Sequence, residues 1–280
     1  MKKIFLLLTL LCLSVSAQAH DAKVDGIFYN LDIVNKTATV TFQGNYYGSY
    51  DNEYSGDVVI PETVTYNGIT YSVMSLGDNC FRGCSSLTAI TIPNSVTSLG
   101  QGCFEGCSSL TSITIPNSVT WLGENCFCGC SSLTAITIPN SVTSLGAWCF
   151  SGCSSLTAIT IGNSVTSLGQ GCFVYCYRLT SIYMLPSTPP GTGSNIFDNT
   201  PLEKVYVVDE DAKTAYQAQA PWNEYEIVVI PTDIEEVGTD KTAPTIVGYY
   251  GLNGKLINGK QRGAVIVRYS DGTTRKVLVK

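Results

Sequence analysis

Cysteine is the residue with the most regular spacing in this chain of 280 residues, and it is the first candidate for chemistry. Thiols can form disulfides, hold zinc or serve as nucleophiles. Pairs of the form Cys-x-x-x-Cys recur at a constant interval, and a further cysteine, Cys128, lies inside the third pair. The pairs are Cys80/Cys84, Cys103/Cys107, Cys126/Cys130, Cys149/Cys153 and Cys172/Cys176.

The spacing within each pair disfavours both a disulfide and a metal site. On a helical turn, residues i and i+4 have Cβ atoms about 5–6 Å apart, which is longer than the ~3.8 Å of a disulfide. Bridges between neighbouring units, or zinc held by the four thiolates of two adjacent pairs, remain open alternatives. Zinc sites usually show the spacing Cys-x-x-Cys, however, so we predict a column of buried thiols with no metal and no cofactor. Cys128 occupies a position that varies between units, and we expect it to be the most exposed thiol.

Other catalytic arrangements are not indicated by the sequence. The only histidine, His20, begins the expected mature chain, where mobile chain ends cannot hold a Ser-His-Asp or Cys-His site in place. Between residues 75 and 182 the only acidic residues are Asp78, Glu105 and Glu124. They fall in different units, so no carboxylate pair for glycoside hydrolysis is suggested. We therefore predict no catalytic residues and no enzyme activity.

The charge balance and the first residues bear on partners and location. The chain has 16 Lys and Arg against 22 Asp and Glu, which disfavours a nucleic-acid-binding surface. Residues 1–19 begin with two lysines, continue with an apolar stretch and end in Ala17-Gln18-Ala19, as a secretory signal peptide does. No later segment approaches the ~20 apolar residues of a membrane helix. The sequence predicts cleavage after Ala19 and a secreted or outer-surface chain without a transmembrane segment.

The cysteines belong to an internal repeat with a period of 23 residues between Ser75 and Ile182. Its pattern is Ser-Leu-Gly-x-x-Cys-Phe-x-Gly-Cys-Ser-Ser-Leu-Thr-x-Ile-Thr-Ile-Pro-Asn-Ser-Val-Thr. Such a period indicates a solenoid, in which each unit buries its apolar side against its neighbours. The Leu, Cys and Phe positions follow helical spacing, whereas the isoleucines alternate with small polar residues as in a strand. Each unit is thus predicted to contain one or two short helical turns and one strand.

The repeat template extends beyond its most regular part and divides the chain into five segments. Its apolar positions can be followed back to Val58, if a hairpin turning at Asn67-Gly68 is inserted, and forward to Ile230, which gives eight strand positions. The run Asp209-Glu210-Asp211 within this part is interpreted as a helix start and not as a calcium loop. The predicted organisation is a signal peptide (1–19), a β-rich N-terminal cap (20–54), the solenoid (55–231), a linker (232–244) and a small C-terminal β-module (245–280).

The units resemble a known family of repeats. The segment Cys103-Phe-Glu-Gly-Cys-Ser-Ser-Leu-Thr-Ser-Ile-Thr-Ile-Pro116 closely resembles BspA-like leucine-rich repeats of bacterial surface proteins. The resemblance implies an α/β leucine-rich-repeat solenoid, with a parallel sheet on one face and short helical turns on the other. It also implies a non-enzymatic protein of the cell surface, associated in some members with adhesion to host proteins. The tail Arg268–Lys280 is similar to the last hairpins of type IX secretion sorting modules.

The outward-facing strand positions provide the candidate binding residues. Because strand residues alternate faces, two exposed columns run along the predicted sheet. One reads Asp57, Ala89, Ser112, Ala135, Ala158, Ser181, Lys204 and Ile227, and the other reads Val59, Thr91, Thr114, Thr137, Thr160, Tyr183, Tyr206 and Val229. Most of these side chains are small, whereas Tyr183, Lys204 and Tyr206 place large side chains together, and aromatic anchors favour binding.

Two tryptophans that break the repeat, Trp121 and Trp148, complete the predicted ligand-binding set. The expected partner is an extracellular protein or a glycan, and the expected function is adhesion or protein binding. A glycan-binding or glycan-processing accessory role and a passive structural spacer remain alternatives. A purely structural role would also explain these residues. The tyrosines would then cover the end of the solenoid, and the tryptophans would pack against a neighbouring unit.

Overall fold

The computed structural model describes residues 20–43 and 53–230, together with the backbone of four strands between residues 246 and 279. The predicted signal peptide (1–19) and linker (232–244) lie outside the described residues. So do the dipeptides Asn253-Gly254, Asn258-Gly259 and Asp271-Gly272, whose turn-forming sequences underlie the prediction of the C-terminal β-module.

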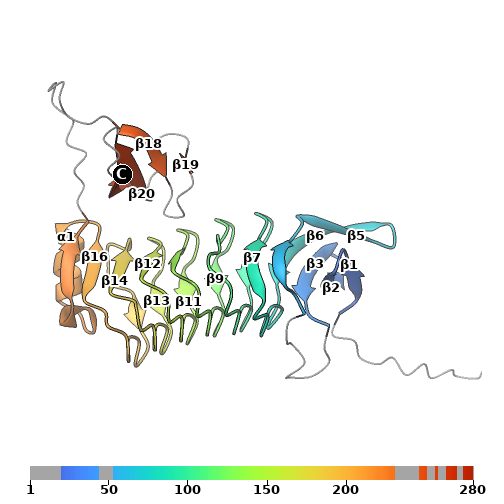
Figure 1. Ribbon diagram of the computed structural model, residues 1–280, viewed down its shortest axis with the longest axis horizontal. Coiled ribbons are helices and arrows are strands. Elements are labelled where there is room, and N and C mark those ends of the chain that lie inside the picture. Colours follow the sequence, from blue (N-terminus) through green and yellow to red (C-terminus); the bar gives the residue numbers. More distant parts are fainter. Residues whose placement is uncertain are drawn as a thin grey trace, which may run out of the picture.

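Residues 55–230 form a solenoid in which successive turns stack side by side along one axis (Figure 1). The alternating isoleucine segments make a column of parallel strands, as the sequence predicts. The isoleucines face the interior, since Ile136 and Ile138 are buried and the intervening Thr137 is exposed. The strands are β4 (Gly56–Val59), β7 (Leu87–Thr91), β10 (Ala135–Thr137), β12 (Ala158–Ile161), β14 (Ser181–Met184), β16 (Lys204–Val207) and β17 (Glu226–Val229).

This column differs from the sequence prediction in two places. Residues 110–115 form no strand, so β4 and β7 make a separate pair from the sheet of β10, β12, β14, β16 and β17. In the last step Lys204 aligns with Glu226 and Val205 with Ile227. The predictions that Ile227 and Val229 lie in the exposed columns are therefore wrong, since they align with the buried Val205 and Val207. Ile227 is buried because the last turn is one residue shorter than the period of 23.

Each turn carries a second short strand that the sequence analysis did not predict. The Ser-Leu dipeptides, and the equivalent Trp121-Leu122 and Gly191-Thr192, pair in parallel from one turn to the next, with Leu99 aligned to Leu122 and Leu145 to Leu168. The strands are β8 (Ser98–Leu99), β9 (Trp121–Leu122), β11 (Ser144–Leu145), β13 (Ser167–Leu168) and β15 (Gly191–Thr192). A strand of two residues shows no alternation, and for this reason sequence periodicity could not reveal it. The solenoid thus has two columns of parallel strands on different sides of each turn.

The Cys-Phe segments, predicted to form helical turns, are chains of hydrogen-bonded turns. The amide of Cys107 donates to the carbonyl of Phe104, three residues earlier, and the amide of Leu110 donates to Cys107 in the same way. Gly102 and Gly106 have positive φ angles of 58° and 74°, which interrupt any regular helix. In addition, the amide of Phe104 donates to Cys126 of the next unit, so these turns also bond across the stack.

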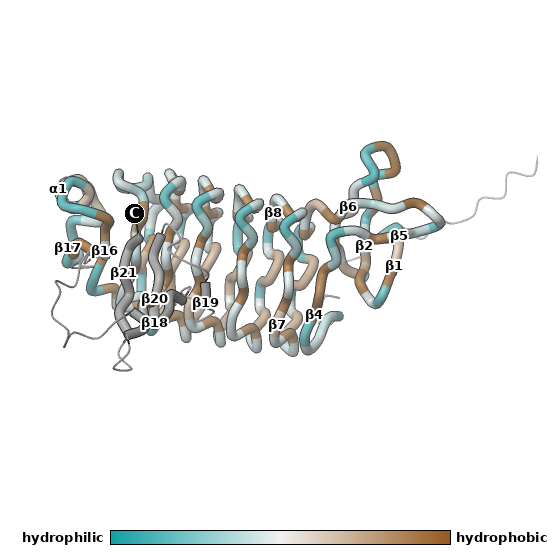
Figure 2. Tube along the Cα trace, turned by 90° about the horizontal axis from the view of Figure 1, so that it is seen from above, coloured by the Kyte–Doolittle hydropathy of each residue, from teal (hydrophilic) through white to brown (hydrophobic). Residues whose placement is uncertain are grey.

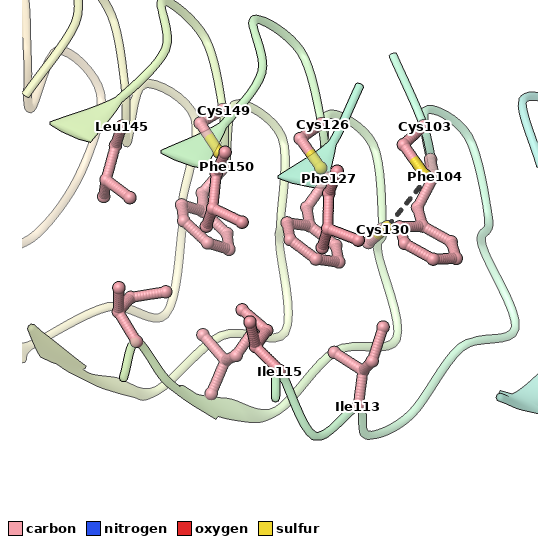
Figure 3. Close-up of a cluster of buried hydrophobic side chains, with 14 of the residues drawn as sticks. Cys103, Phe104, Ile113, Ile115, Cys126, Phe127, Cys130, Leu145, Cys149 and Phe150 are labelled. Carbon is pink, nitrogen blue, oxygen red and sulfur yellow. Dashed lines mark hydrogen bonds between the residues drawn. The ribbon is translucent and has the colours of Figure 1, made fainter. Parts of the chain in front are cut away.

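Stacked aromatic rings fill the interior of the solenoid (Figure 3). The Phe104 and Phe127 rings lie 5.3 Å apart at an interplanar angle of 8°, and the next pair repeats this geometry. The column continues through every described unit and contains Phe81, Phe104, Phe127, Phe150, Phe173 and Phe197. Because each ring buries both faces against its neighbours, a single unit cannot be stable alone. Hydropathy also recurs from turn to turn along the tube in Figure 2.

The glycine after each Ser-Leu strand is required by close contact between units. A Cβ atom added at Gly123 would lie 2.6 Å from the amide nitrogen of Gln101 and from the carbonyl carbon of Gly100. Gly100, Gly146, Gly169 and Gly193 are equally restricted. The backbones therefore approach each other at this corner more closely than any side chain permits.

The N-terminal end of the solenoid is covered by β-structure. Strands β1 (Ala22–Val24), β2 (Ile27–Asp32) and β3 (Thr37–Thr41) are antiparallel, and β3 pairs in parallel with β6 (Ile69–Leu76). Strand β5 (Thr63–Tyr66) joins β6 in the hairpin predicted at Asn67-Gly68, whose φ angles are 49° and 77°. Tyr54 covers the first phenylalanine, with its ring 4.7 Å from that of Phe81.

The C-terminal end is covered by a helix and by two buried aromatic residues, Tyr216 and Trp222. Helix α1 (Glu210–Gln217) begins at Asp209, whose carboxylate accepts a hydrogen bond from the amide of Ala212 at 2.8 Å. This confirms the interpretation of the acidic run as a helix start. The 3-10 helix η1 (Trp222–Glu224) holds the buried Trp222 5.7 Å from the Phe197 ring, with the two rings edge to face. Trp222 thus closes the aromatic column at this end.

A separate antiparallel sheet lies in the C-terminal residues. Its order is β19 (Leu256–Ile257), β18 (Ile246–Tyr250), β20 (Gly263–Tyr269) and β21 (Thr274–Val279).

Candidate functional site

Two tyrosines lie side by side on the exposed face of the sheet formed by β10, β12, β14, β16 and β17. Tyr183 on β14 and Tyr206 on β16 are aligned residues of neighbouring strands. Their rings stack at 4.7 Å between centroids with an interplanar angle of 11°. Burial, followed by the neighbouring Tyr206, raises the pKa of the Tyr183 phenol above its usual value. The Tyr183 ring is therefore neutral near pH 7, and the two rings present an aromatic surface with hydroxyl groups.

Charged side chains flank the stacked rings. Lys204, two residues before Tyr206 on the same face, forms an ion pair with Glu226 of β17 at 3.5 Å. Their side chains are 40% and 62% exposed, so solvent screens the pair and it adds little to stability. The structure thus brings Tyr183, Lys204 and Tyr206 together as the strand register predicts. Glu226 joins them because of the shortened last turn.

The remainder of this face carries small side chains. Thr91, Thr114 and Thr137 are exposed in the column that leads to the tyrosines, whereas Thr160, next to Tyr183, is 4% exposed. The other column of the face contains Ala and Ser at the aligned positions. On this face the exposed aromatic side chains are therefore Tyr183 and Tyr206, although the first strand presents Val59, which is 67% exposed.

The two predicted tryptophans lie away from these tyrosines. Trp121 is 41% exposed on β9, in the other sheet, where it aligns with Ser98 and Ser144. Trp148 is 38% exposed and lies in the turn segment after β11. Its backbone has a positive φ of 52°, a conformation that is rare for a bulky residue. The predicted set of five residues consequently falls into separate surfaces.

Sequence reasoning missed two exposed aromatics in the turn segments. Tyr175 and Tyr177 are 47% and 60% exposed, with ring centroids 6.1 Å apart. Tyr175 replaces the second glycine of the repeat, and Tyr177 replaces its first serine. Both break the repeat pattern at turn positions, and a comparison of every repeat column with that pattern identifies them.

Trp148 and Tyr175 line the same open depression, whose volume is about 420 Å³. The depression spans the turn segments of successive units and also includes the side chain of Cys128. Its remaining lining residues are Asn125, Ser151, Gln170, Gly171, Val174, Asn195, Asp198 and Asn199. The volume falls within the usual range of small-ligand pockets.

The repeat model that matches this sequence is the BspA type leucine rich repeat region, found in six copies over residues 62–180 and 101–220. The chain belongs to the BspA-type leucine-rich-repeat family. Members of this family are repeat scaffolds that generally bind proteins, and no catalytic family is indicated. None of the curated proteins matches the sequence.

Solved leucine-rich-repeat structures share the fold of this BspA-type chain. A protein from Bacteroides ovatus matches with 24% identity and a TM-score of 0.51, over 75% of this chain and 67% of its own. The Treponema pallidum repeat protein TpLRR matches with 22% identity and a TM-score of 0.52, over 65% of this chain and 89% of its own. The pneumococcal vaccine antigen PcpA matches with 22% identity and a TM-score of 0.55, over 69% of this chain and 50% of its own.

The cysteines of these BspA-type units form two buried columns of free thiols. Cys80 and Cys103 of the first column have their sulfur atoms 3.5 Å apart. Cys107 and Cys130 of the second column donate to the carbonyls of Phe81 and Phe104. All eleven described cysteines are free, and Cys128 is the one that is not fully buried, as predicted.

Burial also determines the protonation of these thiols. It raises the pKa of Cys84 to about 11 and that of Cys176 to about 12. It also raises the pKa of Cys128, where the nearby Glu105 carboxylate adds to the effect. A thiol held neutral is a weak nucleophile and a poor metal ligand at neutral pH. The columns therefore act as small apolar side chains between the phenylalanines.

Across the part of the chain that the structure describes, no helix is long and apolar enough to cross a membrane.

Proposed function

We propose that this chain is an exported BspA-type repeat protein that binds an extracellular protein through the C-terminal end of its sheet face. The binding surface consists of Tyr183, Lys204, Tyr206 and Glu226. The observation that carries the proposal is the stack of Tyr183 on Tyr206, at 4.7 Å, beside middle strands that present Ala, Ser and Thr. Aromatic side chains beside charged ones are the usual composition of binding hot spots.

The position of these side chains also supports protein binding. They sit on aligned positions of β14, β16 and β17, a rigid sheet whose strands are held by main-chain hydrogen bonds. Little side-chain freedom remains to be lost on binding, because the two rings already pack against each other. An ion pair that solvent still reaches can exchange partners with charges on another protein.

The proposal includes secretion and the lack of enzyme activity. Residues 1–19 have the composition of a signal peptide, and members of the BspA type are repeat scaffolds. Burial raises the pKa of the Cys103 and Cys130 thiols well above the ordinary value, which makes them unsuited to nucleophilic catalysis.

Binding is tested with purified protein on immobilised fibronectin, collagen and laminin. We expect the wild-type protein to bind at least one of them, and the double variant Tyr183→Ala/Tyr206→Ala to lose about tenfold or more in affinity. The matched control is Thr114→Ala/Thr137→Ala, on the same exposed column but away from the rings. Equal affinities of the two folded variants and the wild type would reject the surface, and no binding by any of them would favour a passive spacer.

Export is tested by expressing the full chain in a Gram-negative anaerobe and sequencing its N-terminus in the cell-surface and medium fractions. The expected mature N-terminus is His20. A chain retained inside the cell with Met1 intact would contradict the secretion part of the proposal.

A further inference from the structure

We infer that the turn side of the solenoid carries a second site, the depression around Trp148 and Tyr175, which binds a neutral glycan. This site is independent of the tyrosine surface on the sheet, whose residues do not line the depression. Its evidence is the backbone conformation of the two aromatic residues, their shared position, and the chemistry of the side chains around them.

Trp148 interrupts a column of residues that tolerate a left-handed backbone. The equivalent positions in other units have φ angles between 54° and 58°, and Trp148 has 52°. They are occupied by Asn79, Gly102, Asn125, Gly171 and Asn195. Glycine and asparagine adopt this conformation readily, whereas a bulky aromatic residue does so only under constraint. The tryptophan is therefore not explained by what the backbone requires at this position.

Tyr175 interrupts a second left-handed column in the same way. Its φ angle is 62°, and the equivalent residues Gly83, Gly106, Gly129 and Gly152 have φ angles between 68° and 74°. Strained residues of this kind concentrate at ligand-binding and catalytic sites, where a side chain must be held in a particular place. Here both strained aromatics line one depression, although they belong to different columns and different units.

The next unit leaves room for the tryptophan ring. A Cβ atom added at Gly171 would lie 2.7 Å from both Cδ1 and Nε1 of Trp148, so the indole edge rests on the glycine backbone. With 38% of Trp148 and 47% of Tyr175 exposed, each ring keeps a surface open to solvent. The two rings therefore provide apolar surfaces on which a flat ligand can stack.

The polar lining matches a ligand with many hydroxyl groups. Asn125, Gln170, Asn195 and Asn199 contribute side-chain amides, each with both donors and acceptors, and Asp198 contributes an acceptor. Among the residues that the structure describes, none makes a hydrogen bond to these four amide groups. A sugar ring has an apolar C–H face that can stack on an aromatic ring and hydroxyl groups that can bond to amides and a carboxylate. The lining thus offers both halves of that complementarity.

The charge of the lining argues for a neutral sugar. None of the lining residues is Lys, Arg or His, and the one charged residue is Asp198. Arg82 occupies the position of Cys128 two units earlier, but it does not line the depression and forms an ion pair with Glu105 at 3.1 Å. A phosphate or an acidic sugar would meet a carboxylate without a cation. A quaternary ammonium ligand would suit the rings and Asp198, but it would leave the amides without partners.

The site is tested first with the purified mature chain on an array of neutral and sialylated oligosaccharides. The best neutral oligosaccharide, and choline as the cationic alternative, are then titrated by isothermal calorimetry. We expect binding to neutral oligosaccharides and none to sialylated ones or to choline. Binding confined to sialylated glycans or choline, or no binding to any neutral glycan on the array, would overturn the inference.

The decisive variant is Trp148→Asn/Tyr175→Gly, which restores the residue types of the two columns. Because Asn and Gly suit a left-handed backbone, we expect a melting temperature within about 3 °C of wild type together with at least a tenfold loss of affinity for the neutral oligosaccharide. The matched control, Asn79→Gly, alters the same column outside the depression and should leave the affinity unchanged. Full affinity in the folded double variant would show that the aromatics do not form the site.

Discussion

The interior and the exterior of this solenoid differ in how strictly residue types repeat from unit to unit. Inside, the same residue types recur in every unit, with phenylalanine rings 5.3–5.8 Å apart and buried thiols beside them. Outside, equivalent positions change from threonine to tyrosine on the sheet, and from glycine or asparagine to tyrosine or tryptophan on the turns. The interior repeats because each unit must fit both neighbours, whereas the outer positions need to fit none.

The exterior also differs between the two ends of the solenoid. The early units present Thr114 and Thr137 to solvent, while the later ones carry Tyr183 and Tyr206 on the sheet and Tyr175 on the turns. Departures from the repeat are therefore concentrated in the C-terminal half. In a protein whose packing is repetitive, such departures are the most informative indicators of function.

The largest expected effect is global unfolding at alkaline pH, which follows from the interior alone. Burial raises the folded-state pKa of Cys84 to about 11 and that of Cys176 to about 12, above the ordinary value of 9.0. The stability that the neutral thiols contribute is complete below pH 9 and is lost as the pH rises through the folded values. Each thiol adds up to ~1.4 kcal/mol of destabilisation per pH unit above 9.

This pH dependence is measured by urea unfolding at pH 7, 8.5 and 10 in the presence of a reductant. We expect similar midpoints at pH 7 and 8.5 and a much lower midpoint at pH 10. Replacing Cys84 and Cys176 by alanine should reduce the decrease in the urea midpoint between pH 7 and pH 10. A midpoint at pH 10 equal to that at pH 7 would mean that the thiols are not buried.

The next effect comes from breaking the aromatic column. Phe127 is fully buried between Phe104 and Phe150, so Phe127→Ala removes contacts on both faces of the ring. We expect a loss of about 3–5 kcal/mol in the free energy of unfolding, measured with urea at pH 7. Thr137→Ala on the exposed face is the control and should change it by less than about 0.5 kcal/mol. Similar losses for both variants would remove the distinction between interior and exterior.

A smaller effect is expected where backbones of neighbouring units meet. Gly123→Ala places a Cβ atom 2.6 Å from the backbone of the preceding unit, and we expect a loss of about 1–3 kcal/mol. Gly191→Ala is the matched control, since the nearest atom to its Cβ, the carbonyl oxygen of Thr166, lies 3.8 Å away. Thermal unfolding of the two variants compares them directly. Equal melting temperatures would show that the corner can widen.

The smallest effect concerns thiol reactivity and leaves stability unchanged. Cys128 is the described cysteine that is not fully buried, so a maleimide should label this residue alone in the native protein. Its raised pKa favours the neutral thiol, and labelling should therefore be slow at pH 7 and accelerate as the pH increases. Mass spectrometry identifies the labelled peptide, and Cys128→Ser should abolish labelling. Label on any of the paired cysteines would contradict the buried columns.

Much of the fold could be predicted because it depends on periodicity. The solenoid, the inward isoleucines, the hairpin at Asn67-Gly68 and the helix after Asp209 all follow from local patterns. The two-residue Ser-Leu strands could not be predicted, since pairing across units and not alternation defines them. Likewise, Ile227 is buried because the last turn of the solenoid is one residue shorter than the others. The residues around Ile227 do not reveal this shortening.

By itself, then, the sequence determined which side chains must be buried, because one unit repeats and its apolar residues have nowhere else to go. It also identified Tyr183, Lys204 and Tyr206 as neighbours, because parallel strands in constant register bring equivalent residues together. Only the tertiary structure decided that Trp121 and Trp148 lie on separate surfaces, and that Trp148 and Tyr175 line one depression. The physical reason is that stacking brings residues of successive units together, as where Trp148 lies against Gly171 of the next unit, and no one-dimensional pattern records these contacts.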